Sequence, residues 1–356
     1  MTSAEPVRFA EIGGAGAPLV SVIIAAFNAE RFIGESCRSA LAQTYRNLEV
    51  IVVDDGSDDS TADVVAALAR TDRRLRLIRQ ANLGVAAARN AAIAAASGEF
   101  LAPLDADDIW DPTKIARQVS RLLEAGPDTG LVYCWWVWMD AENRVLDRSP
   151  RWRVEGHILP RLVEINMTGS ASVPLFRRAI VLQLGGYRTE LRAMGCQGCE
   201  DWDLALRIAE HHAVAAVPAL LVGYRRCANS MSTDGEAMWR SFKEVVGTIA
   251  SRQPAISKGA LQRAQGQFAL HLAGVAFWSG DHLKACRWGL RTRSLALGLS
   301  VFPHVLRMLL RRVFDDHGKG HRLVAELGGF EQHCPADPQI PYDRIYARRW
   351  RRGIRA

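Results

Sequence analysis

The chain contains no run of about 18 uncharged apolar residues, which is the minimum length of a membrane-spanning helix. Its first residues also lack the basic start and apolar block of a secretory signal peptide. Residues 1–17 are instead rich in Gly and Ala, and we expect them to form a flexible leader. These absences predict a cytoplasmic protein without membrane spans.

A disulfide framework and a zinc knuckle are also missing. Seven cysteines are scattered over the chain, and an odd, dispersed set favours a reducing compartment. Cys196 and Cys199 have C-x-x-C spacing, but a four-thiolate zinc site needs a second such pair, which the sequence lacks. No G-x-G-x-x-G follows the first predicted strand, which argues against a dinucleotide-dependent oxidoreductase.

The charge of the chain is uneven. Apolar residues make up 49% and charged residues 23%, as in an ordinary globular protein, and the net charge is +7. Six arginines lie between Arg344 and Arg355, and Val305–Phe314 has the pattern of a basic amphipathic helix. Such segments are either solvated or packed surface, or they contact anionic lipid. Because nothing else supports nucleic-acid binding, we predict no nucleic-acid partner and peripheral contact with the inner face of the cytoplasmic membrane.

Short apolar runs alternate with helical patterns in the first third of the chain. Strands are predicted at 19–26, 48–53, 75–79 and 100–104, with helices at 31–42, 60–68 and 85–96 between them. Ser60 stands three residues before Asp63, which predicts a capping-box-like helix start. This order predicts an α/β fold with a mostly parallel sheet flanked by helices.

The rest of the chain changes character near residue 230. Further strands are predicted at 130–139, 214–217 and 220–224, with an apolar segment at 171–176, a turn at 185–187 and a helix at 204–211. Helices are then predicted at 242–249, 261–278 and 282–297. The sequence thus predicts a C-terminal helical extension on the α/β domain.

Polar residues follow three of the first four predicted strands. They are Phe27-Asn28, Asp54-Asp55 and Asp105 to Asp108. Parallel sheets bind ligands at the carboxyl ends of their strands, so we expect a site there. Carboxylates such as those of Asp105-x-Asp107 suit Mg²⁺ or Mn²⁺ together with phosphate oxygens.

Four segments also carry a resemblance to a known family. They are residues 21–61 (SVIIAAF…VVDDGSDDST), 82–112 (NLGVAAARN…LDADDIWDP), 186–209 (GYRTE…CEDWDLALRIA) and 224–232 (YRRCANSMS). In this order they resemble the inverting family 2 glycosyltransferases, which have the Rossmann-like GT-A fold of nucleotide-diphospho-sugar transferases. The resemblance implies a catalytic domain at 18–232. The sequence pattern beyond it predicts a helical region at 233–330 and a basic tail at 331–356.

The resemblance also implies roles for single residues. Asp201 would be the catalytic base, Asp107 the ligand of Mn²⁺ or Mg²⁺, and Asp105 would lie near the ribose. Asp55 would hold the nucleotide base. The remaining matched positions would line the nucleotide-sugar pocket; they are Ala25, Phe27, Glu30, Asn82, Gly84 and Arg89.

Several side chains keep a second interpretation. Arg89 is equally well a structural salt-bridge partner, and Asp54 a helix cap. Arg225 or Arg226 either neutralises the diphosphate or is surface charge. Trp202 is interpreted as a packing residue. Trp135, Trp136 and Trp138 belong in part to the core, with an acceptor-facing tryptophan as the alternative.

The predicted reaction moves a sugar from a UDP-, GDP- or dTDP-sugar to a saccharide or lipid-linked acceptor of cell-envelope glycan biosynthesis. No Gln-x-x-Arg-Trp motif follows Asp201, which favours single transfer over polymer synthesis. One alternative is a sugar nucleotidyltransferase, although residues 27–30 are not its Gly-rich, basic signature. The other is a non-catalytic nucleotide-sugar-binding or scaffold protein on a degenerate transferase domain.

Overall fold

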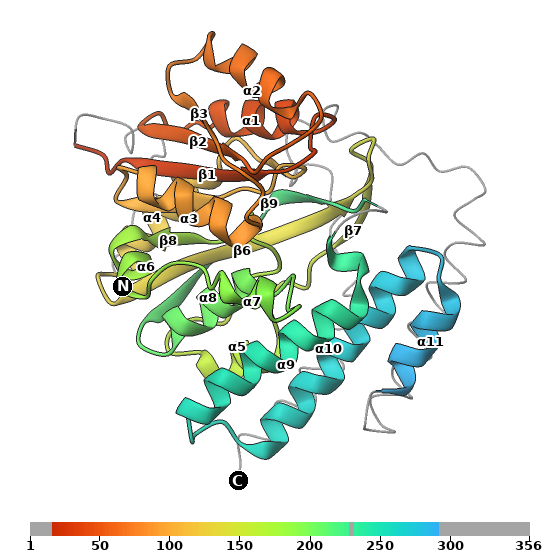
Figure 1. Ribbon diagram of the computed structural model, residues 1–356. Helices are drawn as coiled ribbons and strands as arrows, with labels where there is room; N and C mark the ends of the chain where they lie inside the picture. Colours follow the sequence, from red (N-terminus) through yellow and green to blue (C-terminus); the bar gives the residue numbers. More distant parts are fainter. Residues whose placement is uncertain (1–15, 228–230, 292–356) are drawn as a thin grey trace.

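The computed structural model describes residues 16–227 and 231–291, and a single mixed sheet organises them (Figure 1). Its first four strands are β1 (Val20–Ala26), β2 (Leu48–Asp54), β3 (Leu75–Arg79) and β4 (Phe100–Pro103). They are parallel to one another in the order β3-β2-β1-β4. The apolar run of β1 is buried almost throughout because the strand lies inside the sheet and both of its faces are covered.

Three helices cover these strands. They are α1 (Ile33–Leu41), α2 (Thr61–Ala69) and α3 (Val85–Ala95). In Figure 1, α1 and α2 lie on one side of β1 and α3 on the other, as right-handed crossovers require when the strand order reverses at β1. The carboxyl ends of β1, β2 and β4 therefore meet where the order reverses, which is where such sheets bind ligands.

The predicted capping box at Ser60 is wrong. Ser60 precedes α2, but its side chain makes no capping hydrogen bond. Its backbone N–H instead donates to Glu30 Oε2 (2.9 Å), and the N–H of Thr61 donates to Asp59 Oδ1 (2.9 Å). Carboxylates from outside the predicted motif thus satisfy the start of this helix.

The second half of the sheet contains all the antiparallel pairings. Its elements are β5 (Ile109–Trp110), α4 (Lys114–Glu124), β6 (Thr129–Met139), β7 (Val145–Arg148), α5 (Leu159–Glu164), β8 (Leu175–Arg177), α6 (Arg178–Gln183), α7 (Glu190–Ala193), α8 (Glu200–Ala209) and β9 (Ala213–Arg225). The full order is β3-β2-β1-β4-β8-β6-β9-β5, with β7 paired to β6. Among the described residues four strand pairings are parallel and four antiparallel, so the sheet is more mixed than the sequence predicts.

The two closing strands predicted at 214–217 and 220–224 are one long strand, β9. Its register against β6 jumps from Cys134↔Val217 to Trp135↔Leu220. The exposed Pro218 lies in this jump, because a proline has no N–H for the ladder and is tolerated at a bulge. The bulge lets β9 continue to Arg225, beside the loop that follows β4.

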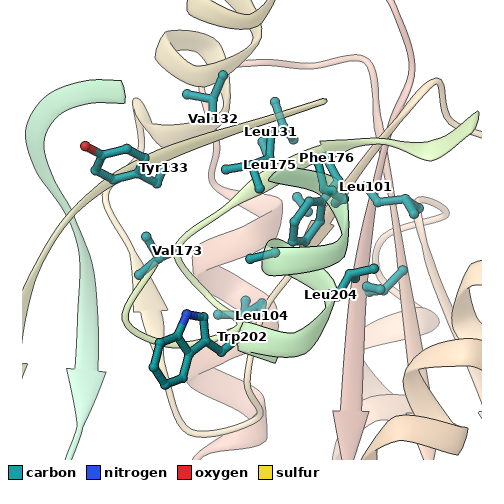
Figure 2. Close-up of a cluster of buried hydrophobic side chains, with 14 of the residues drawn as sticks. Leu101, Leu104, Leu131, Val132, Tyr133, Val173, Leu175, Phe176, Trp202 and Leu204 are labelled. Atoms are coloured by element: carbon teal, nitrogen blue, oxygen red, sulfur yellow. The ribbon is translucent and has the colours of Figure 1, made fainter. Parts of the chain in front are cut away.

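The core beneath this sheet joins β4, β6, β8 and α8 (Figure 2). Leu101, Leu131 and Phe176 are almost fully buried, and Leu204 packs on them from α8. Trp202 is 2% exposed, and its Nε1 donates to the carbonyl of Leu162 (3.0 Å). The prediction that Trp202 is a packing residue is confirmed, and its burial fixes α8 against the sheet.

The C-terminal helices lie away from β1–β3 (Figure 1). They are α9 (Gly235–Arg252), α10 (Lys258–Trp278) and α11 (His282–Leu290), after a short 3₁₀ turn at Met231–Thr233. Helix α9 packs on α8, α10 on α9 and α5, and α11 on α10. Side chains of Asp234, Ser257 and Asp281 cap their N-termini. Phe242 and Phe268 stack on Trp202 with ring centroids 5.8 and 5.9 Å away, so the extension supports the helix that carries Asp201.

Some predictions fall outside the described residues. These are the leader up to residue 15, Cys334, the basic helix at Val305–Phe314, the remainder of the 233–330 region beyond residue 291, and the 331–356 tail. The domain boundary at 232 stays a prediction. Within the described ranges, none of the helices is both long and apolar enough to cross a bilayer.

Candidate active site

The acidic loop after β4 is held by its last member. Asp108 is fully buried; its Oδ2 accepts a hydrogen bond from Ser172 Oγ (2.6 Å) and its Oδ1 one from the backbone N–H of Arg225 (2.8 Å). The backbone N–H of Asp105 donates to the same Ser172 hydroxyl (2.9 Å). The loop is thereby fixed between the segment before β8 and the end of β9, with the carboxylates of Asp105 and Asp107 left for other contacts.

Asp107 is half-buried, and none of the side chains in the described ranges donates a hydrogen bond to its carboxylate. Burial, and then the neighbouring carboxylate of Asp105, raise its pKa to about 6. The nearest cation, Arg225, donates its Nε to the Asp107 carbonyl (2.6 Å) rather than to the side chain. An uncompensated, accessible carboxylate of this kind fits a divalent cation that takes its other ligands from phosphates.

Arg89 joins the two acidic motifs of the chain. Its Nη2 donates to Asp105 Oδ1 (2.7 Å) and its Nη1 to Glu200 Oε1 (2.8 Å), across 111 residues of sequence in the second case. The side chain is 6% exposed and lies over the ring of Tyr187. Burial alone lowers the pKa of the guanidinium, but Asp105 and Glu200 raise it above its ordinary value. Arg89 therefore stays charged and holds the end of β4 against the start of α8.

Asp201 stands in the first turn of α8, which begins at Glu200, four residues before the predicted start. Burial raises the pKa of its carboxyl to about 7; Glu200 and Asp105 add to the rise and Arg89 opposes it. One oxygen accepts the N–H of Trp202 (2.7 Å), and the residue is half-buried rather than sealed. A carboxyl with this pKa accepts and releases a proton near neutral pH, as a general base must.

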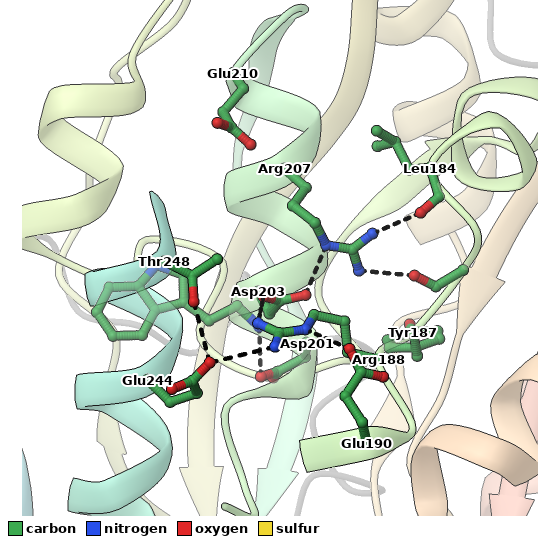
Figure 3. A network of polar contacts seen from close by, with 12 residues as sticks. Leu184, Tyr187, Arg188, Glu190, Asp201, Asp203, Arg207, Glu210, Glu244 and Thr248 are labelled. Atoms are coloured by element: carbon green, nitrogen blue, oxygen red, sulfur yellow. Dashed lines mark hydrogen bonds and ion pairs between the residues drawn. The ribbon is translucent and has the colours of Figure 1, made fainter. Parts of the chain in front are cut away.

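An arginine network links α8 to α7 and α9 (Figure 3). Arg188 contacts Asp203 on α8 (3.4 Å), Glu244 on α9 (3.3 Å) and Glu190 on α7 (2.8 Å). Arg207 also donates to Asp203 (2.7 Å). The helix that carries Asp201 is therefore held by ion pairs to α7 and α9 as well as by the packing of Trp202.

The predicted donor pocket centres on Asp55, at the end of β2. Its Oδ1 accepts hydrogen bonds from Gln80 Nε2 (2.7 Å) and the N–H of Leu83 (2.9 Å), and its Oδ2 one from the N–H of Gly84 (2.8 Å). Gly84 has φ 93° and starts α3, the helix that carries Arg89. Asp55 thus shapes the loop 80–84 and sets the position of α3.

The other predicted pocket residues lie around this loop or the neighbouring one. Asn82 accepts hydrogen bonds from Arg192 of α7 at its side-chain oxygen (2.8 Å) and at its carbonyl (3.3 Å). Ala25 is half-buried near the end of β1, and Phe27 just beyond it is 49% exposed. Glu30 accepts the N–H of Ser60, so its carboxylate serves the start of α2.

The structure brings together residues that the sequence left apart. Asp105, Asp107, Asp201 and Arg89 belong to one cluster, since each carboxylate affects the pKa of a neighbour in it or contacts Arg89. Asp55 is joined to them through Gly84 and α3. Asp54 caps no helix; its Oδ1 accepts the N–H of Ser57 in the turn before α2.

Three contributors were missed or left open by sequence reasoning. Glu200 pairs with Arg89, and Arg192 spans from α7 to the loop 80–84. Arg225 is not surface charge: its side chain is 0% exposed, and it pairs with Glu35 of α1 (2.9 Å). Only Arg225 carried a usable signal, its position beside the predicted closing strand, because the other two pairings join distant segments.

The cysteines and histidines offer no metal cage of their own. All six cysteines in the described part of the chain are free thiols, and no group of three or more His, Cys, Asp or Glu side chains there is arranged to hold a metal. A divalent cation at Asp107 would therefore need oxygen ligands from a bound phosphate.

Known proteins resemble part of this chain. Residues 21–179 match the family model described as Glycosyl transferase family 2. The Escherichia coli protein WfaP, a UDP-Glc:alpha-D-GlcNAc-diphosphoundecaprenol beta-1,3-glucosyltransferase, is 44% identical over 102 residues, which are 28% of this chain and 40% of WfaP. WfgD of the same species, with the same named activity, is 45% identical over 107 residues, 30% of this chain and 42% of WfgD. The chain thus matches less than half the length of these curated relatives.

A solved structure extends the likeness to the fold. The mannosyltransferase PcManGT from Pyrobaculum calidifontis, in complex with GDP-Man and Mn²⁺, has a TM-score of 0.55 and 22% identity, over 84% of this chain and 82% of that one. At this identity the comparison speaks for the fold alone. The fold is GT-A, as the resemblance in the sequence implied.

Proposed function

Because residues 21–179 belong to glycosyl transferase family 2, we propose that this protein transfers one sugar from a nucleotide-diphospho-sugar to an acceptor hydroxyl, with inversion. The observation that carries the proposal is Arg89, which holds Asp105 and Glu200 together and so places Asp201 beside the acidic loop after β4. The reaction requires a general base close to a group that neutralises the leaving diphosphate, and an acidic loop can hold the metal ion for that purpose.

In the proposed reaction, Asp201 takes the proton of the acceptor hydroxyl. The oxygen forms a bond to the anomeric carbon as the bond from that carbon to the nucleoside diphosphate breaks, from the opposite face. The products are the glycosylated acceptor with inverted configuration and a free nucleoside diphosphate. The raised pKa of Asp201, about 7, makes its carboxylate a stronger base than that of an ordinary aspartate, while a large fraction is still deprotonated at neutral pH.

The donor would lie over the ends of β1, β2 and β4. We assign the nucleoside to the half-buried Ala25, the exposed Phe27 and the loop 80–84 that Asp55 shapes, with Asn82 and Gly84 at its rim. Asp105, positioned by Arg89, faces the ribose, and Glu30 supports the same region through α2. Mn²⁺ or Mg²⁺, held by Asp107 and phosphate oxygens, would neutralise the charge of the leaving diphosphate.

The acceptor class is inferred from the relatives. WfaP and WfgD are named for transfer to a sugar linked to diphosphoundecaprenol. We extend this to a lipid-linked saccharide of cell-envelope glycan synthesis, reached from the inner face of the cytoplasmic membrane. The basic segments near the C-terminus would favour that contact; sedimentation with anionic vesicles at low salt tests it, and a protein that stays in the supernatant argues against it.

The proposed function is tested by a donor screen. The full-length protein is incubated with UDP-, GDP- and dTDP-sugars, Mn²⁺ and an envelope lipid extract, and nucleoside diphosphate release is measured. Acceptor-dependent release from one donor is expected. Pyrophosphate chemistry instead would favour a nucleotidyltransferase, and an absence of both turnover and nucleoside diphosphate binding would favour a non-catalytic scaffold.

Replacing Asp107 with Ala is expected to abolish the stimulation of nucleoside diphosphate binding by Mn²⁺, a loss of about tenfold or more in affinity. Calorimetry with and without Mn²⁺ measures this. Asp58→Ala, an exposed aspartate in the loop before α2, is the matched control and should keep the stimulation. An Asp107→Ala protein whose binding still responds to Mn²⁺ would show that Asp107 is not the ligand.

A further inference from the structure

Arg225 and Arg226 are neighbours in sequence but have different surroundings. Each nitrogen of the Arg225 guanidinium donates a hydrogen bond: Nε to the Asp107 carbonyl, Nη2 to Glu35, and Nη1 to Asn143 and two carbonyls. The backbone of Arg226 is fixed by a hydrogen bond to the Met139 carbonyl (2.9 Å). Because side chains alternate along a strand, Arg226 points to the face opposite Arg225.

On that face Arg226 lies against two tryptophans. Its guanidinium carbon is 4.5 Å from the ring centroid of Trp138 on β6 and 5.5 Å from that of Trp278 at the end of α10. Aromatic rings stabilise the cation through its faces, which leaves the N–H groups at its edge as donors. Trp278 is 40% exposed, so the arrangement is open to solvent on one side.

In the described part of the chain, no carboxylate pairs with the guanidinium of Arg226. It has no ion pair or side-chain hydrogen bond with the residues in the described ranges, and its Nη1 is buried without a partner. Burial lowers the pKa of Arg226, and Tyr224 and Asp147 oppose the fall. The buried His271 of α10 is also within electrostatic range, and burial and Arg226 lower its pKa to about 4, so it stays neutral and supplies no anion. A buried donor on a cation costs free energy unless a ligand satisfies it.

Tyr224 places this group beside the acidic loop. Burial and the carboxylates of Asp108, Asp105 and Asp107 raise the pKa of its phenol, while Arg226 lowers it. Tyr224 is therefore within electrostatic range of both the acidic loop and Arg226. Trp136, whose ring is 5.8 Å from that of Trp138, adds a second buried donor without a partner, its Nε1.

We propose that Arg226, Trp138 and Trp278 form a subsite that binds a phosphoryl group carried by the acceptor. The inference rests on the proposed function, whose acceptor it narrows to one that carries a phosphate ester. Edge-on guanidinium donors match phosphate oxygens, and the tryptophan rings accept the attached sugar or hydrocarbon. A neutral saccharide would leave the charge of Arg226 uncompensated.

Binding of decyl phosphate to the full-length protein in EDTA, measured by calorimetry below micelle formation, tests the subsite. EDTA removes the metal on which the proposed donor site depends. Arg226→Met is expected to weaken binding by about tenfold or more, and Arg226→Lys by less. Arg291→Met is the matched control, because Arg291 also lies over a tryptophan, Trp288, but pairs with Glu236, and it should bind within about twofold of the parent.

Three further measurements test the specificity for a phosphoryl group and the contribution of the tryptophans. Decyl glucoside should bind more weakly than decyl phosphate and be insensitive to Arg226; equal binding of both would overturn the phosphoryl assignment. If inorganic phosphate bound as tightly as decyl phosphate, the tryptophan rings would contribute nothing to binding. Trp278→Ala changes a residue that is 40% exposed, so the variant should fold, and it should also weaken decyl phosphate binding.

Failure of this subsite and failure of the proposed function give different results. If Arg226→Met binds decyl phosphate as well as the parent does, the subsite is wrong, whatever the donor screen finds. If no nucleotide-sugar is turned over but decyl phosphate binding depends on Arg226, the anion site stands and the transfer reaction does not.

Discussion

Asp201→Asn is expected to lower kcat by a factor of about 10² to 10⁴, the usual contribution of a general base. The amide keeps the size of the carboxyl and its hydrogen bond from the N–H of Trp202, but it has no basic oxygen for the acceptor proton. The measurement is the rate of acceptor-dependent nucleoside diphosphate release with the donor identified by the screen.

Two controls separate loss of the base from loss of the fold. Nucleoside diphosphate binding to Asp201→Asn should stay within about twofold of the parent, since the assigned donor contacts lie on other segments. Asp63→Asn, the same change at an exposed position on α2, should leave turnover intact. Near-native turnover of the Asp201→Asn protein would show that Asp201 is not the general base.

The pH profile provides a second readout. A base acts in its deprotonated form, and burial raises the pKa of Asp201 to about 7, so its active form predominates only above that pH. The parent kcat/KM should therefore rise with pH and level off above about pH 8, falling about tenfold per unit well below the pKa. The residual activity of Asp201→Asn should lack this limb, and a parent profile that is flat from pH 5 to 8 would contradict the assignment.

The fold could be predicted where local pattern and burial agree. The apolar runs at 19–26 and 48–53 became β1 and β2 within a residue, because a strand covered on both faces must be apolar throughout. The start of α8 was predicted too late, because Glu200 to Asp203 carry three acidic residues and Cys199 gives no capping signal. Two closing strands were predicted at 214–217 and 220–224, whereas the ladder with β6 continues between them as a bulge in one strand.

In the candidate site, too, features set by local sequence could be predicted, and contacts between distant segments could not. Asp105 and Asp107 could be proposed from sequence because each follows a buried strand, and the end of a strand is a local property. The contact of Arg89 with Glu200 could not, because it depends on how α8 docks on the sheet, which Trp202 and the arginine network decide. The sequence left two interpretations of Arg89, a salt-bridge partner or a residue of the nucleotide-sugar pocket. The structure shows the salt bridges, and a role in donor binding stays a proposal.

Replacing Arg89 with Met is expected to lower the free energy of unfolding by about 3–5 kcal/mol, the usual cost of removing one partner from a buried ion pair. Two carboxylates lose their cation: Glu200 is 9% and Asp105 26% exposed. Urea denaturation at pH 7 measures the change, and turnover should fall as well, because the end of β4 and the start of α8 lose their link.

Arg79→Met is the matched control for this loss. Arg79 contacts the buried Asp54 at 3.3 Å, but its own side chain is 67% exposed, so its removal should cost less than about 1 kcal/mol. Adding Glu200→Gln to Arg89→Met should restore part of the stability, because it removes one of the stranded charges. If Arg89→Met were as mild as Arg79→Met, Arg89 would not be what holds the two acidic motifs together, and the convergence behind the proposed site would need another cause.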